Sequence, residues 1–256
     1  VTSATAPTSI ANLSSGSEKA KLSAKENKSL KILSNWNGYY GKREVAATIY
    51  NRFLYEVLEA TYKDEMGASF NQFLNTPYQD KALAEQIVRE ESVWWDNVKT
   101  KNKKENRIDI ITASFKSTTT FLENQLGGNV DDWTWDKVVS IEYPHALGKV
   151  AALRKYFNVG PFKTIGGNEV INNQSYKIDS TGYYKISSGP STRRIVDFSD
   201  VENSLGILPT GQSGNVFSPH YDDQAQKYID GKFVKMKLNQ NEIETSKNVL
   251  IFKVKN

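Results

Sequence analysis

The sequence predicts an α+β fold, with a helical N-terminal half followed by a strand-rich C-terminal part. Apolar residues recur at helical spacing before residue 160, and short segments broken by glycine and asparagine follow it. Helices precede strands without regular alternation, which argues against a parallel βαβ fold. We expect a small polar segment at 1–32, a helical region at 33–160 and a strand-rich region at 161–256, together forming one partial domain of a larger protein.

Composition excludes several classes of function. The chain has no cysteine, which rules out disulfides, thiolate metal sites and cysteine catalysis. Its net charge of +4, from 33 basic and 29 acidic residues, is too small to predict a nucleic-acid partner. No apolar stretch of the sequence reaches the ~20 residues that a membrane-spanning helix requires. The composition therefore predicts neither a nucleic-acid partner nor a membrane span.

The first helical element is weak and the second is strong. The polar segment at 1–32 contains one stretch, from about Ala6 to Leu13, that predicts a short helix before a Ser/Gly-rich break. After the Trp36-Asn37-Gly38 turn, apolar residues repeat every four positions and predict a mostly buried helix that ends at Gly67. The repeating residues are Val45, Ile49, Phe53 and Val57.

Three further helices are expected before residue 160. The first runs from about Asp80 to Trp94, with Leu83, Ile87 and the Val93-Trp94 pair facing inward. The second runs from Ile108 to Leu126 and is stopped by Gly127-Gly128. The third is shorter, beginning near His145 and ending before Gly160-Pro161.

Strands dominate the expected structure after Gly160. The segments 191–198, 205–208 and 249–254 are rich in β-branched and aromatic residues and predict three strands. A short helix is expected from Asp222 to Ile229, with acidic residues in its first turn, where the helix dipole favours them.

The stretch ILPTGQSGNVFSPHYDDQ, residues 207–224, contains the residue types of a hydrolase site. Ser213 or Ser218 could form a triad with His220 and an aspartate, but Gly211-Gln212-Ser213-Gly214 is not the GxSxG nucleophile elbow. Asp222 and Asp223 could bind a hard cation, although adjacent carboxylates usually point in different directions. We expect a scaffold instead, with Gly211 and Gly214 at turns and Pro219–Gln224 as a helix entry that His220 and Asp222 fix by hydrogen bonds.

Two tryptophan pairs leave a different function open. Trp94-Trp95 and Trp133-Thr134-Trp135 could form a stacking platform for a sugar or another ligand in a non-catalytic binding module. That alternative requires the rings to be exposed on one surface. Nucleotide binding is not predicted, because Gly127-Gly128 and Gly166-Gly167 lack the lysine and flanking pattern of a P-loop.

Several stretches, taken in chain order, are similar to one family. They are LSNWNG at 33–38, AATIYNRFLYEVLEATYKDEMG at 46–67, WTWDK at 133–137, YPHALG at 143–148, FNVGP at 157–161, GGNEVIN at 166–172, GPSTRRIVDF at 189–198 and LPTGQSGNVFSPHYDDQ at 208–224. In this order the chain resembles, from about Leu33 to Phe233, the C-terminal part of the β subunit of the penicillin amidase (penicillin acylase) family. The residues assigned to this structural motif are Trp36, Gly38, His145, Gly160, Pro161, Arg194, Pro209, Gly211, Gln212, Ser213, Gly214, His220, Tyr221, Asp222, Asp223 and Gln224.

The resemblance implies an N-terminal-nucleophile hydrolase with an αββα sandwich, of which this chain supplies helices and late strands. In such a protein a precursor cuts itself into α and β chains and exposes a serine at the start of β. The serine amine acts as the base, the hydroxyl attacks an amide carbonyl, and an acyl-enzyme forms. An asparagine side chain and backbone N–H groups stabilise the oxyanion. The implied substrates are β-lactam side-chain amides or N-acyl homoserine lactones.

The resemblance also implies what lies outside the segment. Nothing in the sequence matches the family's nucleophile or oxyanion asparagine, so no catalytic residue is assigned and the segment alone is expected to be inactive. Val139 stands where the family often has a histidine. The expected partners are the α subunit and the N-terminal half of β. Calcium is possible in the full-length protein through residues elsewhere, no cofactor is expected in this segment, and the parent protein is expected to be periplasmic or secreted.

Overall fold

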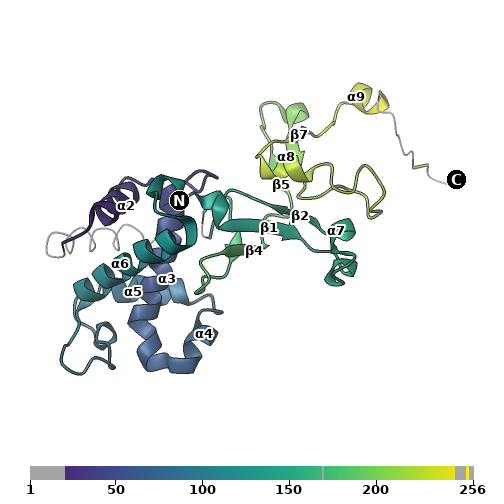
Figure 1. Ribbon diagram of the computed structural model, residues 1–256. Helices are drawn as coiled ribbons and strands as arrows, with labels where there is room; N and C mark the ends of the chain where they lie inside the picture. The colour runs from purple at the N-terminus through teal and green to yellow at the C-terminus, as the bar shows by residue number, and fades with distance from the viewer. Residues whose placement is uncertain (1–20, 169, 246–251, 254–256) are drawn as a thin grey trace. The chain divides into compact units, whose positions relative to one another are not determined.

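The computed structural model describes residues 21–168, 170–245 and 252–253, and within them the chain divides into two compact units (Figure 1). The first unit comprises Val1–Ile141 and Phe162–Gly189, and the second comprises Glu142–Pro161 and Pro190–Asn256. The units therefore interleave along the sequence. The successive parts expected at 1–32, 33–160 and 161–256 stay a prediction.

The first described helix is α2, Ala24–Ser34, which begins within the segment predicted to be small and polar. Ser23 and Glu26 form a capping box, in which each side chain accepts a hydrogen bond from the other residue's backbone N–H, so the helix begins at a defined point. The helix predicted from Ala6 to Leu13 lies outside the described residues.

The centre of the first unit is α3, Val45–Met66, packed against α6, Arg107–Leu126 (Figure 1). Both helices confirm the predictions and both end at a glycine with positive φ, 53° at Gly67 and 95° at Gly127. The rings of Phe53 and Phe115 meet edge to face with centroids 5.7 Å apart, and both are buried. Such a pair stabilises the helix contact by about 1 kcal/mol beyond its buried area.

The helix predicted from Asp80 to Trp94 is shorter than expected. Helix α5 covers Gln79–Ile87, with Leu83 and Ile87 buried as predicted, and the chain then turns into the 3₁₀ helix η2, Val93–Trp95. The Trp95 indole donates to the Arg89 carbonyl oxygen at 2.9 Å, and the Ser92 hydroxyl accepts from the Trp94 N–H. These bonds replace a continued α-helix, and Val93 is exposed rather than inward-facing.

Two short helices, flanked by two strands, stand where one helix was predicted from near His145 to before Gly160. Strand β1 is Val139–Tyr143 and strand β2 is Val159–Phe162; between them lie η5, Leu147–Lys149, and α7, Arg154–Phe157. The Asn158 side chain accepts from the His145 N–H at 3.0 Å and occupies the space beside Gly148. The helix is interrupted at Val150, whose ψ of 118° is extended rather than helical.

The described strands form two sheets. The four-stranded sheet has the order β2-β1-β4-β3, where β3 is Ser175–Tyr176 and β4 is Tyr184–Ser188. Strands β1 and β4 are parallel, with Val139 opposite Tyr184, and β3 is antiparallel to β4. The three-stranded antiparallel sheet has the order β5-β6-β7, formed by Arg193–Ile195, Leu205–Ile207 and Val234–Lys235.

The second sheet confirms two predicted strands and corrects the helix that follows. Strands β5 and β6 lie within the predicted segments 191–198 and 205–208, whereas β7 was not predicted. The segment 249–254 lies outside the described residues apart from Phe252 and Lys253, which are in no strand. Helix α8 is Ala225–Ile229 and begins three residues later than expected, because the Asp222 carbonyl accepts from the Ala225 N–H in a preceding turn. The acidic residues are therefore outside its first turn.

The remaining helices are short. They are η1, Gly67–Ser69; α4, Phe70–Phe73; η3, Val130–Asp132; η4, Trp135–Lys137; η6, Val201–Asn203; and α9, Gln240–Glu244. Among the helices of the described ranges, none has both the length and the apolar character to cross a membrane. The element order, helices first and most strands later, confirms the α+β class.

Candidate functional site

Trp36 and Gly38 belong to an aromatic cluster in the first unit. Gly38 takes a φ of 81°, and the Trp36 indole closes this turn by donating to the Tyr39 carbonyl oxygen at 2.9 Å. The ring of Tyr40 lies between Trp36 and Trp135, with centroid distances of 5.3 Å to each. These two motif residues therefore fix the position of Tyr40.

A buried polar network runs from this cluster into α3. The Asn51 amide donates to the Tyr40 hydroxyl at 3.2 Å and accepts from the Tyr176 hydroxyl at 2.7 Å. Burial raises the pKa of both Tyr40 and Tyr176, so both hydroxyls stay protonated at neutral pH. The network therefore acts as a structural link between α3 and β3 and supplies no base or nucleophile.

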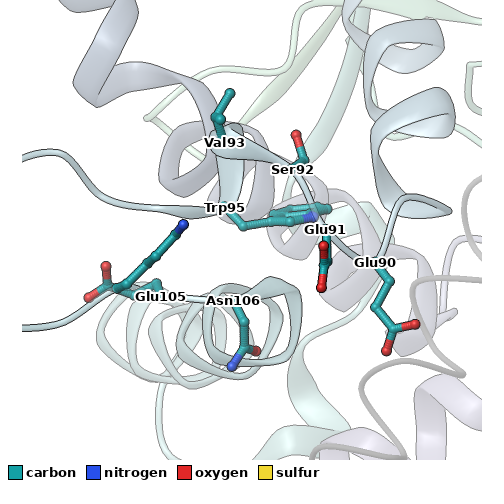
Figure 2. Close-up of a pocket in the computed structure, with 8 residues that line it drawn as sticks. Glu90, Glu91, Ser92, Val93, Trp95, Glu105 and Asn106 are labelled. Atoms are coloured by element: carbon teal, nitrogen blue, oxygen red, sulfur yellow. The ribbon is translucent and has the colours of Figure 1, made fainter.

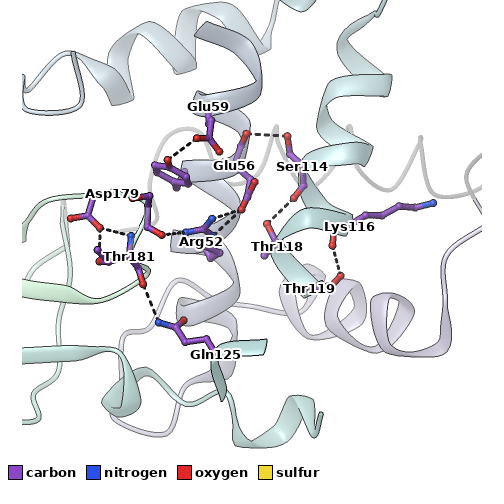
Figure 3. Close-up of polar contacts among 12 residues, drawn as sticks. Arg52, Glu56, Glu59, Ser114, Lys116, Thr118, Thr119, Gln125, Asp179 and Thr181 are labelled. Carbon is purple, nitrogen blue, oxygen red and sulfur yellow. Dashed lines mark hydrogen bonds and ion pairs between the residues drawn. The ribbon is translucent and has the colours of Figure 1, made fainter. Parts of the chain in front are cut away.

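A second buried polar group, Arg52, lies one residue further along α3 (Figure 3). Its guanidinium pairs with Glu56, donates to the Ser180 carbonyl oxygen at 3.0 Å, and stacks on Phe121 with 3.4 Å between Cζ and the ring centroid. Burial is the main cause that raises the pKa of Glu56, and the Arg52 charge opposes it. The charge is thus held by a carboxylate, a carbonyl and an aromatic face.

Asn51 and Arg52 were missed by the sequence reasoning. Both are polar residues in a helix whose neighbouring positions are mostly apolar and buried, and this pattern is the signal that could have indicated them. Their partners Tyr176 and Ser180 are more than 100 positions away along the chain, so the signal could indicate a buried polar pair but not what it binds.

The prediction that the tryptophan pairs form a stacking platform for a ligand is wrong. Trp95, Trp133 and Trp135 are at most 1% exposed, and the indoles of Trp133 and Trp135 donate to the carbonyl oxygens of Gly127 and Gly166. Trp94 is half-buried against Tyr62, with ring centroids 5.3 Å apart. A sugar or base cannot stack on rings that form the core, so the non-catalytic binding module built on these residues is excluded.

A pocket of about 540 Å³ lies between the end of α5 and the start of α6 (Figure 2). Its lining gathers the carboxylates of Glu90, Glu91 and Glu105 beside the Trp95 ring. The Ser92 hydroxyl at its rim accepts from the Trp94 N–H, and Glu105 accepts from the Asn97 N–H at 3.2 Å. Among the described residues, neither the Ser92 hydroxyl nor any other lining side chain is hydrogen-bonded to a side chain that could act as its base, so the pocket shows no activated nucleophile.

The diagnostic stretch 208–224 forms a closed loop in the second unit. The Gly211 N–H donates to the Tyr221 carbonyl oxygen at 2.8 Å, and the Ser213 N–H donates to the His220 carbonyl oxygen at 3.0 Å. A Cβ at Gly211 would lie 1.9 Å from that His220 oxygen, so only glycine allows the two arms to meet. The Tyr221 hydroxyl ties the loop to the Phe157 carbonyl oxygen. Gly211 marks a close approach of two backbones, as a scaffold role requires.

No triad is assembled in this loop. The Ser213 and Ser218 hydroxyls accept from the backbone N–H groups of Asn215 and His220, each at 3.1 Å. The His220 ring lies 2.9 Å from the Asp223 carboxylate, and both side chains are exposed. A pair of surface groups of this kind contributes little stability.

The remaining motif residues also have structural positions. His145 stacks on Phe157 with ring centroids 5.0 Å apart, Gly160 has a φ of 105°, and the Gly160-Pro161 peptide is cis. The Gln224 side-chain oxygen accepts from the Leu208 N–H at 3.0 Å, which joins the ends of the diagnostic stretch next to Pro209. Arg194 lies exposed in β5 and, with Gln212 and Gln224, lines a hollow on the three-stranded sheet.

Metal ligands do not gather in the part of the chain that the structure describes. No group of three or more His, Asp or Glu side chains is placed to hold an ion there. Calcium bound through residues elsewhere in a full-length protein stays a prediction, and no chemistry is derived through it.

The comparisons with known proteins agree on one family. The family model described as penicillin amidase matches residues 1–245. Acyl-homoserine lactone acylase QuiP from Pseudomonas aeruginosa is 28% identical over 208 residues, which cover 73% of this chain and 24% of that protein. The protein of the same name from Pseudomonas fluorescens Pf-5 is 26% identical over 229 residues, covering 87% of this chain and 27% of that protein. The chain thus spans about a quarter of the length of these relatives.

A solved structure shows the same fold. Thermostable penicillin G acylase from Alcaligenes faecalis superposes with a TM-score of 0.52 over 96% of this chain and 46% of that chain, at 16% identity. At this identity the likeness is one of fold alone. The family model, which covers nearly all of the sequence, settles membership. The chain belongs to the penicillin amidase family.

Proposed function

We propose that this chain is the C-terminal segment of an amide hydrolase whose substrates are N-acyl homoserine lactones. The observation that carries the proposal is the alignment of most of the chain with acyl-homoserine lactone acylases at 26–28% identity, within a family match over residues 1–245. Penicillin G acylase supports the fold only, so β-lactam side-chain amides are the competing substrate in the test rather than a second proposal.

In this proposal the chemistry belongs to a serine outside the segment. An N-terminal serine whose own amine acts as the base attacks the amide carbonyl, and water later releases the acid from the acyl-enzyme. The hydrogen bonding of Ser213, Ser218 and His220 supports this division, because each candidate hydroxyl accepts from backbone and none pairs with the ring in the described structure. The segment itself then has a structural role: it supports the fold that holds the active site.

The rest of the same precursor is then the main partner. The α chain and the N-terminal half of the β chain would supply the nucleophile, the oxyanion hole and most of the acyl pocket. We also propose export to the periplasm or beyond for the parent protein. Fractionation of cells that express the precursor tests this, and a product that remains wholly in the cytoplasm contradicts it.

The test of activity uses the precursor that contains this segment. With N-decanoyl homoserine lactone, the mature protein should release free homoserine lactone, measured as a primary amine, and decanoic acid in equal amounts. A variant with alanine in place of the N-terminal serine of β should release neither. Opening of the lactone ring without amine release would identify a lactonase and contradict the proposal.

Two further measurements separate the competing readings. Faster turnover of a phenylacetylated β-lactam amide than of the acyl homoserine lactone would reassign the substrate class and leave amide hydrolysis intact. The isolated 256-residue chain should release no amine from either compound, and turnover by that chain would place the nucleophile inside it.

A further inference from the structure

A hollow of about 440 Å³ lies on one face of the three-stranded sheet in the second unit. Strand register explains its shape. Arg194 of β5 is directly opposite Gly206 of β6, and Gly206 is directly opposite Val234 of β7, so the three residues form one row across the sheet. Residues opposite one another point to the same face, and the middle one has no side chain. The row therefore places a cationic side chain and an apolar side chain on either side of a glycine.

Gly206 is not required by the backbone. Its φ lies outside the left-handed region, and glycine weakens a strand relative to residues with side chains. A Cβ at this position would extend into the hollow to 3.2 Å from Cγ and Sδ of Met236. Glycine within a strand often marks the close approach of a ligand. Here glycine lets the Met236 side chain pack close to β6, and both residues line the hollow.

The polar groups around the hollow are donors. Arg194 is exposed, and its guanidinium has no ion-pair or hydrogen-bond partner among the described residues. Gln224 directs its oxygen to the Leu208 N–H, which leaves its NH₂ group as a donor at the rim beside the Gln212 amide. Lys235 also lines the hollow but pairs with Glu242 at 2.8 Å. No lining residue is acidic, so the hollow presents one free cation and amide donors.

We propose that this hollow binds the carboxylate of an acid that carries an apolar chain. The carboxylate accepts two parallel hydrogen bonds from Arg194, the geometry that a guanidinium provides. The apolar chain lies against Val234 and Met236, beside Gly206. One unpaired cation matches a singly charged carboxylate, and the apolar wall distinguishes an acid with an alkyl chain from a small anion. The proposal is independent of the proposed function, because binding needs no turnover.

Sodium decanoate is the probe, titrated by calorimetry into the complete 256-residue chain. We expect one site per chain. Arg194→Gln should weaken binding at least tenfold, since it removes the charge-assisted bonds without removing a contact that holds the fold. Gly206→Val should weaken binding by a similar factor, because its side chain would push the Met236 side chain into the hollow. The matched controls are Lys227→Gln, an exposed cation on α8, and Gly214→Ala, where a Cβ meets nothing within 4 Å, and both should bind like the unchanged chain.

Changes to the ligand test whether both its carboxylate and its apolar chain are recognised. Decanol, which keeps the chain and lacks the charge, and acetate, which keeps the charge and lacks the chain, should each bind at least tenfold more weakly than decanoate. Equal binding of decanoate by Arg194→Gln, or no binding at millimolar concentration, overturns the proposal.

One further arm uses the longer precursor. If decanoate binds the 256-residue chain but does not bind the precursor, the proposal is also overturned, because another segment then covers the hollow. If the precursor hydrolyses amides and Arg194→Gln leaves its affinity for decanoate unchanged, only the binding site proposed here is refuted. Decanoate binding without amide hydrolysis refutes only the proposed function.

Discussion

The Asn51 side-chain oxygen accepts a hydrogen bond from the Tyr176 hydroxyl at 2.7 Å, although 125 positions separate the two residues in the chain. Because the same amide donates to Tyr40, one buried side chain satisfies two buried hydroxyls. A buried polar group without a partner costs about 1–3 kcal/mol. The Asn51 amide therefore stabilises the first unit by more than the small size of its side chain suggests.

Asn51→Leu should lower the free energy of unfolding of the first unit by about 2–4 kcal/mol, because both hydroxyls lose a partner. Urea unfolding followed by tryptophan fluorescence measures it. All five tryptophans lie before residue 141, so the signal reports the first unit. Asn71→Leu, at an exposed position of α4, is the control and should change stability by less than about 0.5 kcal/mol. Equal effects of the two changes would contradict a role for the network.

Arg52→Met should destabilise the first unit by about 3–5 kcal/mol near pH 8, because it leaves the Glu56 carboxylate buried without its cation. Burial already raises the pKa of Glu56, and loss of Arg52 raises it further. The folded state of the variant then favours protonated Glu56, so the loss should shrink as the pH is lowered toward 5. The same fluorescence titration at both pH values measures this.

The control for this prediction is the double variant Arg52→Met with Glu56→Gln. It has no carboxylate to protonate, so its stability relative to the unchanged chain should depend less on pH than that of Arg52→Met. A constant loss for Arg52→Met at both pH values would show that the lost stacking on Phe121, rather than the unpaired charge, dominates.

Glu65 makes the stability of the first unit pH-dependent in the opposite sense to most carboxylates. Partial burial, together with the neighbouring carboxylates of Asp64 and Asp96, raises the pKa of Glu65 from 4.5 to about 7. The folded state binds the proton more tightly, so this contribution to stability is present below pH 4.5 and is lost as the pH rises to about 7.

Glu65→Gln removes this loss and should stabilise the first unit at pH 8 by less than about 1 kcal/mol, since solvent screens an exposed side chain. The two proteins should be equally stable at pH 4, as measured by urea unfolding at each pH. Asp96→Asn removes one neighbouring charge and should lower the pKa of Glu65 in an NMR titration. A difference between Glu65→Gln and the unchanged chain that is the same at all pH values would contradict the assignment.

Gly211→Ala should destabilise the second unit by about 2 kcal/mol or more, because its Cβ would collide with the His220 carbonyl oxygen and separate the two arms of the loop. The measurement is limited proteolysis, which should cut within residues 208–224 faster in the variant. Gly214→Ala, where a Cβ meets no atom within 4 Å, should be cut at the original rate. Equal rates in the two variants would show that the loop is not closed at Gly211.

Local periodicity was enough to predict the two long helices. The four-residue repeat through Ile49 and Phe53 and the glycine after each helix are signals within the element itself, and they prevailed even over the poor helix formers of the 117–120 segment, where Thr118 donates to the Ser114 carbonyl oxygen. The end of α5 was missed because a local cap at Ser92 outweighed the continuing apolar spacing.

The parts of the site that depend on distant pairing could not be predicted. No carboxylate partner could be named for the His220 ring, because sequence does not reveal which of the adjacent Asp222 and Asp223 faces it. The hollow beside Arg194 exists only through the register of three strands, one of which, β7, carries no clear strand signal. The family resemblance predicted membership correctly, since it uses ordered motifs and needs no register.

The interleaving of the two units has a consequence for synthesis on the ribosome. The chain leaves the first unit after Ile141 and returns to it at Phe162, so this unit is not complete until Gly189 has been translated. The second unit starts at Glu142 and waits for residues beyond Pro190. Domains made of one continuous segment fold in order as they emerge. Here the helical bundle around α3 emerges well before the strands that complete its unit, and its apolar face must remain uncovered, or be held by chaperones, during that interval.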